Sequence, residues 1–388
     1  MEYPPLYQEQ KRMEAIRHTL HKYPELAYEE LLTKTTICNE LDSLGIRYVT
    51  GYGKTGIRAE LGDNASGACV ALRADMDALP VTEQTGLEFS SLHPGIMHAC
   101  GHDGHVAMLL GAARLLSHQK IHGQVVLLFQ PAEESGNGAA AMIADNCLQD
   151  VDMIFGGHID THFPPGILTV DRGLICSYVD PFTIEIQGLG GHAAKPHETV
   201  DAIIAAANLI MNIQTLVSRR INPAQPAVVT VGKISAGTTH NVIAEKAVLE
   251  GTIRSGHPAT RKQLLQELQR IIDGVGKMHN AQVRLQLHTG LPAVINDDLS
   301  TSIAHRAAVE VAGQEQVISQ GSPSLGGEDF AFYQQKIPGC MIRFGARKTT
   351  GAGPAHSNKF DFDEAVFSYG ARWLTTSALL ALEELSRQ

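Results

Sequence analysis

The sequence lacks any long run of Lys or Arg, and this absence excludes one class of partner. Its 388 residues carry 31 Lys and Arg against 41 Asp and Glu, which gives a formal net charge of −10. Binding along a nucleic-acid backbone requires clustered basic side chains. We therefore expect no nucleic-acid partner, and we interpret the acidic excess as a contribution to solubility.

Cysteine is also scarce, and no two cysteines form a Cys-x-x-Cys pair. The first residues, MEYPPLYQEQKRMEAIR, lack the apolar segment of a signal peptide. A disulfide framework is therefore not expected in a chain of this length, whereas a cytoplasmic location is. Most of the cysteines are expected to be small core residues, with Cys100 as the exception. The six are Cys38, Cys69, Cys100, Cys147, Cys176 and Cys340.

No apolar run reaches the length of a membrane span. The longest, near residues 202–213, is shorter than the roughly 20 residues that a transmembrane helix needs, so no membrane contact is expected. Hydrophobic residues make up 44% of the chain and charged residues 19%, which is typical of a globular protein. The length predicts two or three domains.

Segments with helical periodicity alternate with short apolar runs in the first half of the chain. Residues 105–117 have apolar side chains at helical spacing, and QVVLLF at 124–129 is typical of a buried strand. Alternating strands and helices predict an α/β domain with a largely parallel sheet. The expected helices are 6–22, 28–44, 105–117 and 138–147, and the expected strands are 56–62, 68–74, 124–129 and 153–156.

The pattern changes after about residue 180, where PFTIEIQGLGG alternates apolar and polar residues like a half-exposed strand. A strand, a helix, two strands, a helix and a strand then follow in order, which indicates a ferredoxin-like α+β module. We interpret the chain as a catalytic domain of residues 1–180 and 294–388, interrupted by an inserted domain of residues 181–293. In the insert, the expected helices are 199–217 and 259–275, and the later strands are 227–234, 247–253 and 283–288.

The densest group of reactive side chains lies in MHACGHDGH, residues 97–105. One thiol, three imidazoles and a carboxylate fall where a loop enters a helix. Thiolate and imidazole are ligands that Zn²⁺ and similar ions prefer, and Gly101 and Gly104 allow the backbone to bend so that side chains converge. A single histidine here would more often be a partly buried structural residue, but the number of ligands favours a metal site.

Two adjacent carboxylates follow the expected strand at 124–129. Glu133 and Glu134 lie in a Gly-rich loop before the next helix. Open α/β sheets bind ligands at the carboxyl ends of their strands. Two exposed glutamates in a turn are the plainer interpretation. The functional interpretation divides their roles, with one binding a metal and the other abstracting a proton from water.

Further candidates follow other strands. Asp75 and Asp77, in RADMDALP, are two apart on an extended segment and so point the same way. They form either a polar strand end or a device that orients a ligand histidine. His158, in FGGHID, follows the 153–156 strand, and His356 lies in a loop near the C-terminus. Together these two supply imidazoles for a second metal site.

The motifs resemble those of the M20 metallopeptidase superfamily. The resemblance rests on MHACGHDGH, PAEESGNGA, RADMDALP, GLGGHAAKPH and GGEDFAFY, and it extends from about Arg17 to Ala381. The nearest branch is the amidohydrolases that include hippurate hydrolase, the plant auxin-conjugate hydrolases and the N-acyl-amino-acid deacylases. The resemblance implies two divalent ions (Zn, Mn, Co or Ni), with Cys100 shared between them. The implied ligands are Cys100, His102, Glu134, His158 and His356.

The resemblance also implies roles for residues that bind no metal. Glu133 is expected to be the general base, and Asp77 is expected to orient a ligand. His192 would polarise the scissile carbonyl, while Asn241 and Arg254 would bind the substrate's carbonyl or carboxylate. This chain departs from the family pattern once, because NVIAE stands where Asn-Val-Ile-Pro-Asp is expected.

The implied reaction is the hydrolysis of an amide. Two metal ions lower the pKa of a water, Glu133 takes its proton and later delivers it to the leaving amine, and His192 helps to stabilise the oxyanion. The expected substrate is a small N-acyl amino acid, which yields a carboxylic acid and an amino acid. The inserted domain is expected to act as a lid and to form a homodimer contact.

Three other functions remain open on the same residues. A dipeptidase or aminopeptidase would need a group that captures a free amine, and the sequence identifies none. A non-catalytic metal-binding protein would not need Glu133 beside Glu134. A thiol enzyme with Cys100 as the nucleophile would stay active after chelation.

Overall fold

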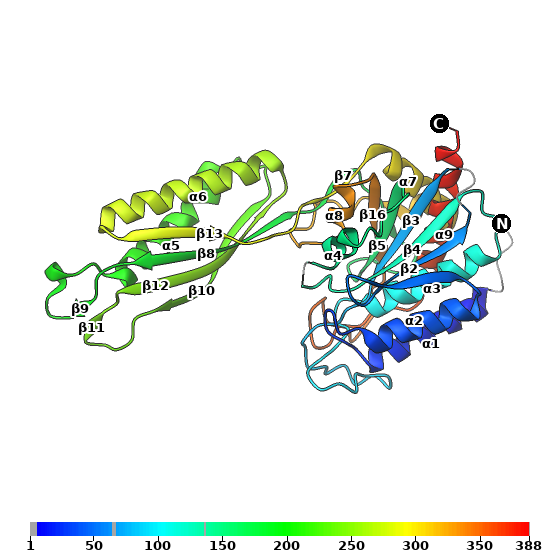
Figure 1. Cartoon of the computed structure of the whole chain (residues 1–388), viewed down its shortest axis with the longest axis horizontal. Helices are drawn as coiled ribbons and strands as arrows, with labels where there is room; N and C mark the ends of the chain where they lie inside the picture. Colours follow the sequence, from blue (N-terminus) through cyan, green and yellow to red (C-terminus); the bar gives the residue numbers. More distant parts are fainter. Residues whose placement is uncertain (1–5, 64–66, 136, 388) are drawn as a thin grey trace. The chain divides into compact units, whose positions relative to one another are not determined.

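The computed structural model describes residues 6–63, 67–135 and 137–387. The chain forms two compact units, which can be followed by colour in Figure 1. The larger unit comprises Met1–Ile175, Val294–Ser322 and Asp329–Gln388, and the smaller unit comprises Cys176–Ala293 and Pro323–Glu328. Most of the smaller unit is therefore a single insertion into the chain of the larger one.

An eight-stranded sheet runs through the larger unit in the order β1-β2-β4-β3-β5-β16-β6-β15. Its four central strands pair in parallel, and every residue of β3 is buried, as expected for a sheet covered on both faces. The predicted α/β class with a mostly parallel sheet is confirmed. The strands are β1 (Arg47–Tyr52), β2 (Gly56–Gly62), β3 (Cys69–Asp75), β4 (Gln124–Gln130), β5 (Met153–Asp160), β6 (Leu168–Thr169), β15 (Val317–Ile318) and β16 (Gly339–Gly345), with β7 (Gly173–Cys176) and β14 (Val294–Asn296) as a separate pair.

Helix α3 is the most deeply buried helix beside this sheet, because it packs against both α1 and α9. Trp373 of α9 is fully buried, and its indole N–H donates to the Ala304 carbonyl of α7 at 3.0 Å. These helices and the sheet share one hydrophobic core. The helices are α1 (Leu6–Lys22), α2 (Leu31–Ser43), α3 (His102–Ser117), α4 (Gly138–Ala144), α7 (Asp298–Ala312), η3 (Gln314–Gln316), α8 (Ala331–Gln334) and α9 (Val366–Leu385).

The smaller unit has a core of its own. Its antiparallel strands follow the order β10-β12-β8-β13, and α5 and α6 pack side by side against them. This is the predicted ferredoxin-like arrangement. Asp201 accepts hydrogen bonds from the N–H groups of Ile203 and Ile204 and so starts α5 at Ala202. The elements are β8 (Tyr178–Gln187), α5 (Ala202–Arg220), β10 (Ala227–Ala236), β12 (Lys246–Ser255), α6 (Pro258–His279) and β13 (Gln282–Leu287).

The apolar stretch at 202–213 lies in α5, which begins and ends three residues later than the predicted helix 199–217. The helix has 19 residues and is long and apolar enough to cross a membrane, by length and composition only. The prediction that this stretch is too short was wrong, because the helix continues to Arg220. Core helices pass the same test, and α5 buries Ala205, Leu209 and Ile213 in the core of the smaller unit.

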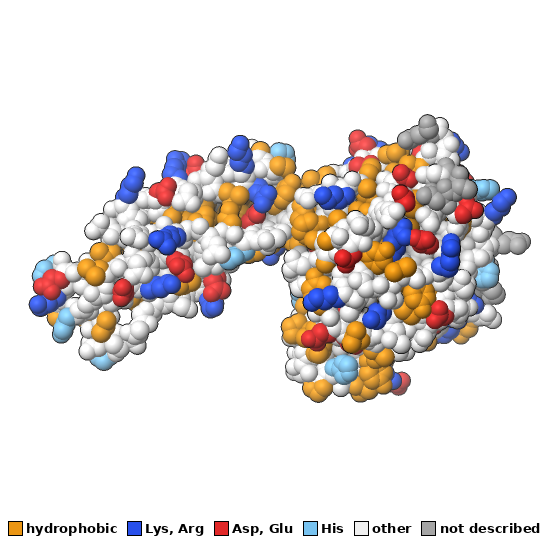
Figure 2. All heavy atoms as spheres, viewed as in Figure 1, with side chains coloured by type: hydrophobic (Ala, Val, Ile, Leu, Met, Phe, Trp, Pro, Cys, Tyr) orange, Lys and Arg blue, Asp and Glu red, His pale blue; other side chains and the backbone are white. Residues whose placement is uncertain are grey.

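The surface mixes charges of both signs. Figure 2 shows acidic and basic side chains interspersed with hydrophobic ones over the face in view. In the smaller unit, large hydrophobic side chains are exposed on several elements. They include Ile203, Ile204 and Met211 of α5, and Val228 and Ile234 of β10.

Strand β5 is longer than predicted. It runs on to Asp160 instead of ending at Gly156, so His158 lies within the strand rather than after it. The glycines of FGGHID serve packing, because a Cβ on Gly157 would overlap the Phe344 ring of the neighbouring strand.

Helix α3 begins three residues earlier than predicted, at His102. Gly101 precedes it with a φ of 96°, a conformation that favours glycine. The chain therefore turns directly into the helix after Cys100, and His102 occupies the first helical turn.

Candidate metal centre

The predicted metal ligands gather near the carboxyl ends of parallel strands. Cys100 and His102 stand at the start of α3, Glu134 follows β4, and His158 lies near the end of β5. The ligand atoms of Cys100, His102 and His158 lie within 4.8 Å of one another, and so do those of Cys100, Glu134 and His356. Cys100 belongs to both groups, at the edge where open α/β sheets bind ligands.

His158 turns an unprotonated ring nitrogen toward the Cys100 thiol. Its Nδ1–H donates to the carbonyl of Ile159 at 2.7 Å, so Nε2 keeps its lone pair. That Nε2 lies 3.4 Å from Sγ of Cys100. The separation allows both atoms to bind one ion, since zinc bonds are about 2.3 Å to sulfur and 2.0–2.1 Å to nitrogen.

His102 is oriented through the same ring nitrogen. Its Nδ1–H donates to the Asp77 carbonyl at 2.9 Å. Its Nε2 is buried and has no hydrogen-bond partner among the described residues, and it lies 3.9 Å from Oε1 of Glu134. A buried polar atom without a partner costs free energy, which a cation between this nitrogen and the carboxylate would remove.

The Asp77 carboxylate organises three of the candidate residues. Its Oδ1 accepts from the N–H of Glu133 and its Oδ2 from the N–H of Glu134, each at 3.0 Å. Oδ1 also lies 3.2 Å from Nδ1 of His102. One buried carboxylate thus holds the loop after β4 and the His102 ring in a fixed relation, as an orienting residue must.

His356 reaches the cluster from a distant part of the chain. Its backbone has a φ of 65°, and its N–H donates to the Ala99 carbonyl at 2.7 Å. Its Nε2 lies 3.3 Å from Oε1 of Glu134, while the side chain remains 57% exposed. The combined donors are one sulfur, three nitrogens and a carboxylate, a set that fits zinc and similar divalent ions.

Burial sets the protonation of these groups when no metal is bound. It raises the pKa of the Cys100 thiol to about 12 and lowers the pKa of His158 well below its usual range. Burial also opposes a charge on His102, but Asp75 and the bond to Asp77 hold its pKa well above the usual value. A thiol with so high a pKa is a poor nucleophile at neutral pH, so metal binding would have to displace its proton.

The chain matches the family described as Peptidase family M20/M25/M40 over residues 71–379. It belongs to that family. The resemblance predicted from the motifs is therefore confirmed, and the protein is an M20 hydrolase.

Relatives with similar sequences include amidohydrolases and peptidases. The M20 hydrolase is 41% identical over 376 residues to an N-acetyl-L-cysteine deacetylase of Bacillus subtilis, covering 96% of this chain and 89% of that protein. It is 38% identical to the IAA-amino acid hydrolase ILR1-like 2 of Arabidopsis thaliana, covering 96% and 85%. It is also 38% identical to thermostable carboxypeptidase 1 of Saccharolobus solfataricus, covering 95% and 94%.

A solved structure supports the fold. A Bacillus subtilis protein described as a dinuclear metal binding peptidase from the M20 family superposes with a TM-score of 0.86 at 34% identity. The match covers 97% of this M20 hydrolase and 99% of that chain.

Two of the predicted substrate-contacting residues meet in the smaller unit. Strands β9 (Gly191–His192) and β11 (Val242–Ile243) pair, and the N–H of Ala193 donates to the Asn241 carbonyl at 3.1 Å. Nδ1 of His192 accepts the N–H of Ala194 at 3.0 Å. The neutral His192 ring therefore carries its proton on Nε2, where it is available to a carbonyl oxygen.

Arg254, the third predicted substrate-contacting residue, lies half-buried on β12. Its side chain has no ion pair or hydrogen bond among the described residues of this M20 hydrolase, and burial lowers the pKa of its guanidinium. A half-buried charge without a partner is costly, so the side chain is suited to bind an anion such as a carboxylate.

The structure also brings together residues for which no role was predicted. Arg17 and His21 of α1 both contact the buried Asp103, next to His102, at 3.3 and 2.8 Å. His21 also lies 3.4 Å from Glu83. Asp103 was visible in MHACGHDGH, but no local pattern connected it with a helix some eighty residues earlier.

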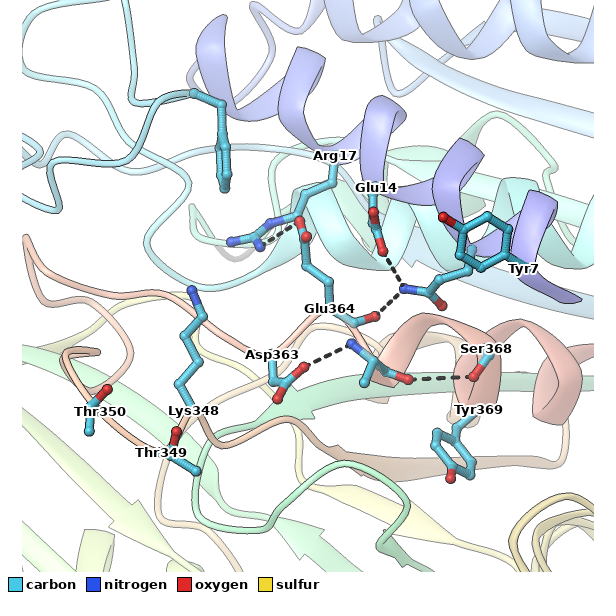
Figure 3. A pocket seen from close by; sticks show the side chains of 13 residues that line it. Tyr7, Glu14, Arg17, Lys348, Thr349, Thr350, Asp363, Glu364, Ser368 and Tyr369 are labelled. Atoms are coloured by element: carbon cyan, nitrogen blue, oxygen red, sulfur yellow. Dashed lines mark hydrogen bonds and ion pairs between the residues drawn. The ribbon is translucent and has the colours of Figure 1, made fainter.

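Arg17 also forms part of the wall of a cavity of about 940 Å³ between α1 and the start of α9. Figure 3 shows Arg17 and Glu364 paired there, at a distance of 2.9 Å. Arg17 itself is 1% exposed because Asp103, Asp361 and Glu364 surround it. His21 also pairs with Asp103 and Lys348 with Asp361, so the carboxylates are balanced within the protein and the ion network holds α1 in place.

Proposed function

We propose that this M20 hydrolase cleaves the amide bond of N-acyl amino acids and releases a carboxylic acid and an amino acid. The observation that carries the proposal is the pair of ligand groups that share Cys100 beside Glu133. Such an arrangement fits two divalent ions next to a carboxylate base. The deacetylase and amino acid hydrolase among the relatives support an N-acyl amino acid as substrate.

The five ligands divide into two sets around the shared thiol. Cys100, His102 and His158 would hold one ion, and Cys100, Glu134 and His356 would hold the other. When bound, two such ions polarise the substrate carbonyl and make a water more acidic. The ion identity is open among Zn, Mn, Co and Ni.

Glu133 is the proton carrier in this proposal. Its backbone is fixed by Asp77, and its side chain is only 9% exposed. It takes a proton from the attacking water and gives it to the nitrogen of the leaving amine. His192 donates from Nε2 to the carbonyl oxygen as negative charge develops there.

Arg254 sets the class of substrate. Its unpaired guanidinium would bind the carboxylate of the amino acid product, and Asn241 would contact the substrate carbonyl. A carboxypeptidase uses the same recognition, because a peptide is also an acylated amino acid. The carboxypeptidase relative makes this the second candidate function.

The substrate class is tested by comparing three series with the protein reconstituted in each metal. They are N-acetyl and N-benzoyl amino acids, dipeptides with a free amine, and N-acyl amino acids whose carboxylate is capped as an amide. We expect the first series to react fastest and the capped series to react poorly. Faster cleavage of dipeptides would favour a peptidase, and full activity after chelation would contradict a metal-dependent reaction.

Glu133 and Glu134 are neighbours with different expected roles, so they form a matched pair. Glu133→Gln keeps the size of the side chain and should lower turnover by about 10²- to 10⁴-fold, the usual effect of losing a general base. Its metal content, measured by elemental analysis, should not change. Glu134→Gln should instead lose metal. Near-normal turnover in Glu133→Gln would rule it out as the base.

The smaller unit is also proposed to form the homodimer contact. β10 is an edge strand of its sheet, with unpaired backbone groups that favour pairing with another strand. Val228 and Ile234 on β10 and Met211 on α5 are exposed hydrophobic residues. A second copy of the chain would cover this edge and these side chains.

A further inference from the structure

His105 lies in MHACGHDGH but belongs to neither of the two ligand sets. Its Nε2 accepts the N–H of Ile159 at 2.9 Å, and its Nδ1 contacts Oδ1 of Asp75 at 2.5 Å. Because an N–H must donate, Nε2 is the acceptor and Nδ1 carries the proton. Both nitrogens are therefore occupied by the protein, although the ligand atoms of Asp75, His102 and His105 lie within 4.8 Å of one another.

The group that His105 holds is the backbone that orients His158. The N–H that His105 accepts belongs to the peptide bond between His158 and Ile159. The carbonyl of the same residue, Ile159, accepts the Nδ1–H of His158 at 2.7 Å. This bond directs Nε2 of His158 toward the Cys100 thiol. His105 thus fixes the peptide segment that fixes the His158 ring.

Asp75, which contacts Nδ1 of His105, is anchored in the sheet. Arg73 donates to Oδ2 of Asp75 at 2.7 Å, to Oε1 of Gln130 at 2.8 Å and to Oδ1 of Asp329 at 2.9 Å. Arg73 and Asp75 are both almost fully buried. Asp75 is therefore a rigid acceptor for His105, and the chain of bonds runs from β3 through α3 to β5.

Gly104 makes this chain of bonds sterically possible. A Cβ at Gly104 would lie 2.6 Å from Cδ1 of Ile159 and 2.6 Å from the ring of Phe362. Only glycine therefore allows the first turn of α3 to approach β5 closely enough for His105 to reach the Ile159 amide.

We propose that Asp75 and His105 form a positioning pair that holds His158 in place for metal binding. The inference rests on the ligand sets of the proposed function. It predicts that the pair affects one metal position only. The set containing His158 should weaken when the bond to Ile159 is lost, whereas the set containing Glu134 and His356 should not.

Two substitutions that introduce an amide side chain distinguish the two hydrogen bonds of His105. In His105→Gln, the amide oxygen can take the place of Nε2 and accept the Ile159 N–H. In His105→Asn, the shorter amide can take the place of Nδ1 and donate to Asp75, but it leaves Ile159 without an acceptor. Both variants remove the imidazole, so neither could replace it as a metal ligand.

The experiment measures zinc bound per full-length chain at a series of buffered free-zinc concentrations. We expect two ions in the unaltered protein and in His105→Gln. In His105→Asn, affinity at one position should fall by about 10- to 100-fold, the usual effect of losing a residue that orients a ligand. The absorption spectrum of the cobalt-loaded proteins should show the same loss, and metal-free variants should unfold at similar temperatures.

Each other outcome overturns the inference. If both variants keep both ions tightly, His105 does not position His158. If both lose an ion equally, His105 acts as a ligand or only as packing. If the unaltered protein binds fewer than two ions, the proposed ligand sets fail and the inference fails with them. The unaltered protein therefore tests the proposed function, and the difference between Asn and Gln tests the positioning pair.

Discussion

His102, His105 and His158 each have at least one ring nitrogen occupied by the protein, and this occupancy determines what the ring can do. In His102 and His158 the Nδ1–H donates to a backbone carbonyl, so Nε2 remains free to bind a metal. In His105 both nitrogens are engaged. Their hydrogen bonds thus separate the three histidines into two candidate ligands and one positioning residue.

Cys100 should react with an alkylating reagent only after the metal is removed. A bound metal would occupy its sulfur, whereas removing the metal with a chelator leaves a protonated thiol. This thiol reacts slowly because burial raises its pKa to about 12. Labelling at alkaline pH, followed by peptide mass spectrometry, measures the difference. Cys38 is the internal control, since it is half-buried and lies outside both ligand sets. Equal labelling of Cys100 with and without chelator would contradict its role as a ligand.

At the scale of elements, the sequence pattern predicted the bounds of those helices and strands whose ends depend on nearby residues. Helix α1 and strand β2 have the predicted bounds, because periodic burial and flanking turn residues fix them. The predicted strand β5 was too short. Its glycines pack against the rings of Phe344 in β16 and Phe330 just before α8, and both rings are remote in sequence. The pairing of β9 with β11 joins two-residue strands about fifty residues apart, and segments so short carry no periodicity.

The contact between α1 and α3 makes the stability of the larger unit depend on pH. Burial opposes a charge on His21, but hydrogen bonds to Asp103 and Glu83 outweigh it and raise its pKa to about 9, even with Arg17 nearby. The folded pKa lies above the unfolded value of about 6.5. The stabilisation is therefore complete below pH 6.5 and is lost as the pH rises through about 9.

Replacing His21 should remove this dependence. We expect His21→Gln to lower the free energy of unfolding by about 1–3 kcal/mol at pH 6, because it leaves Asp103 with one fewer cation, and by much less at pH 9.5. Denaturant unfolding followed by the fluorescence of Trp373, the single tryptophan, reports on the larger unit. His18→Gln is the matched control, since this half-buried neighbour on the same helix stacks on Phe89 and pairs with Glu364 instead of Asp103. An equal loss at both pH values would contradict a charged His21.

At the scale of the whole molecule, the proposed site draws on both units. The candidate ligands and Glu133 belong to the larger unit, whereas His192, Asn241 and Arg254 belong to the smaller one. Cys100, His102 and Glu134 could be proposed from compact motifs, whereas His158 and His356 were proposed as ligands through the family resemblance. The sequence could not predict which copy of the smaller unit acts on which cluster, because that depends on packing between units and between chains. If His192 polarises the carbonyl of a substrate held at the cluster, a conformational step must precede the chemistry.

His192→Ala should lower turnover without changing metal content. The residue would contact only the developing oxyanion, and the loss of one such donor costs about 10²- to 10³-fold in turnover. Single-turnover rates and elemental analysis measure the two quantities. Loss of metal in this variant would show that His192 acts on the cluster instead.

Mixing two inactive variants tests whether His192 serves the site of the neighbouring chain. If each site combines one chain's cluster with the other chain's His192, a mixed dimer of Glu133→Gln and His192→Ala has one fully intact site and one doubly altered site. With free exchange of equal amounts, half of the dimers are mixed, so activity should recover to about one quarter of that of the unaltered protein. Exchange is verified by co-purification of differently tagged chains. If mixed dimers form and no activity returns, His192 acts on the cluster of its own chain. If no dimers form at any concentration tested by sedimentation, the proposed contact through β10 and α5 is wrong.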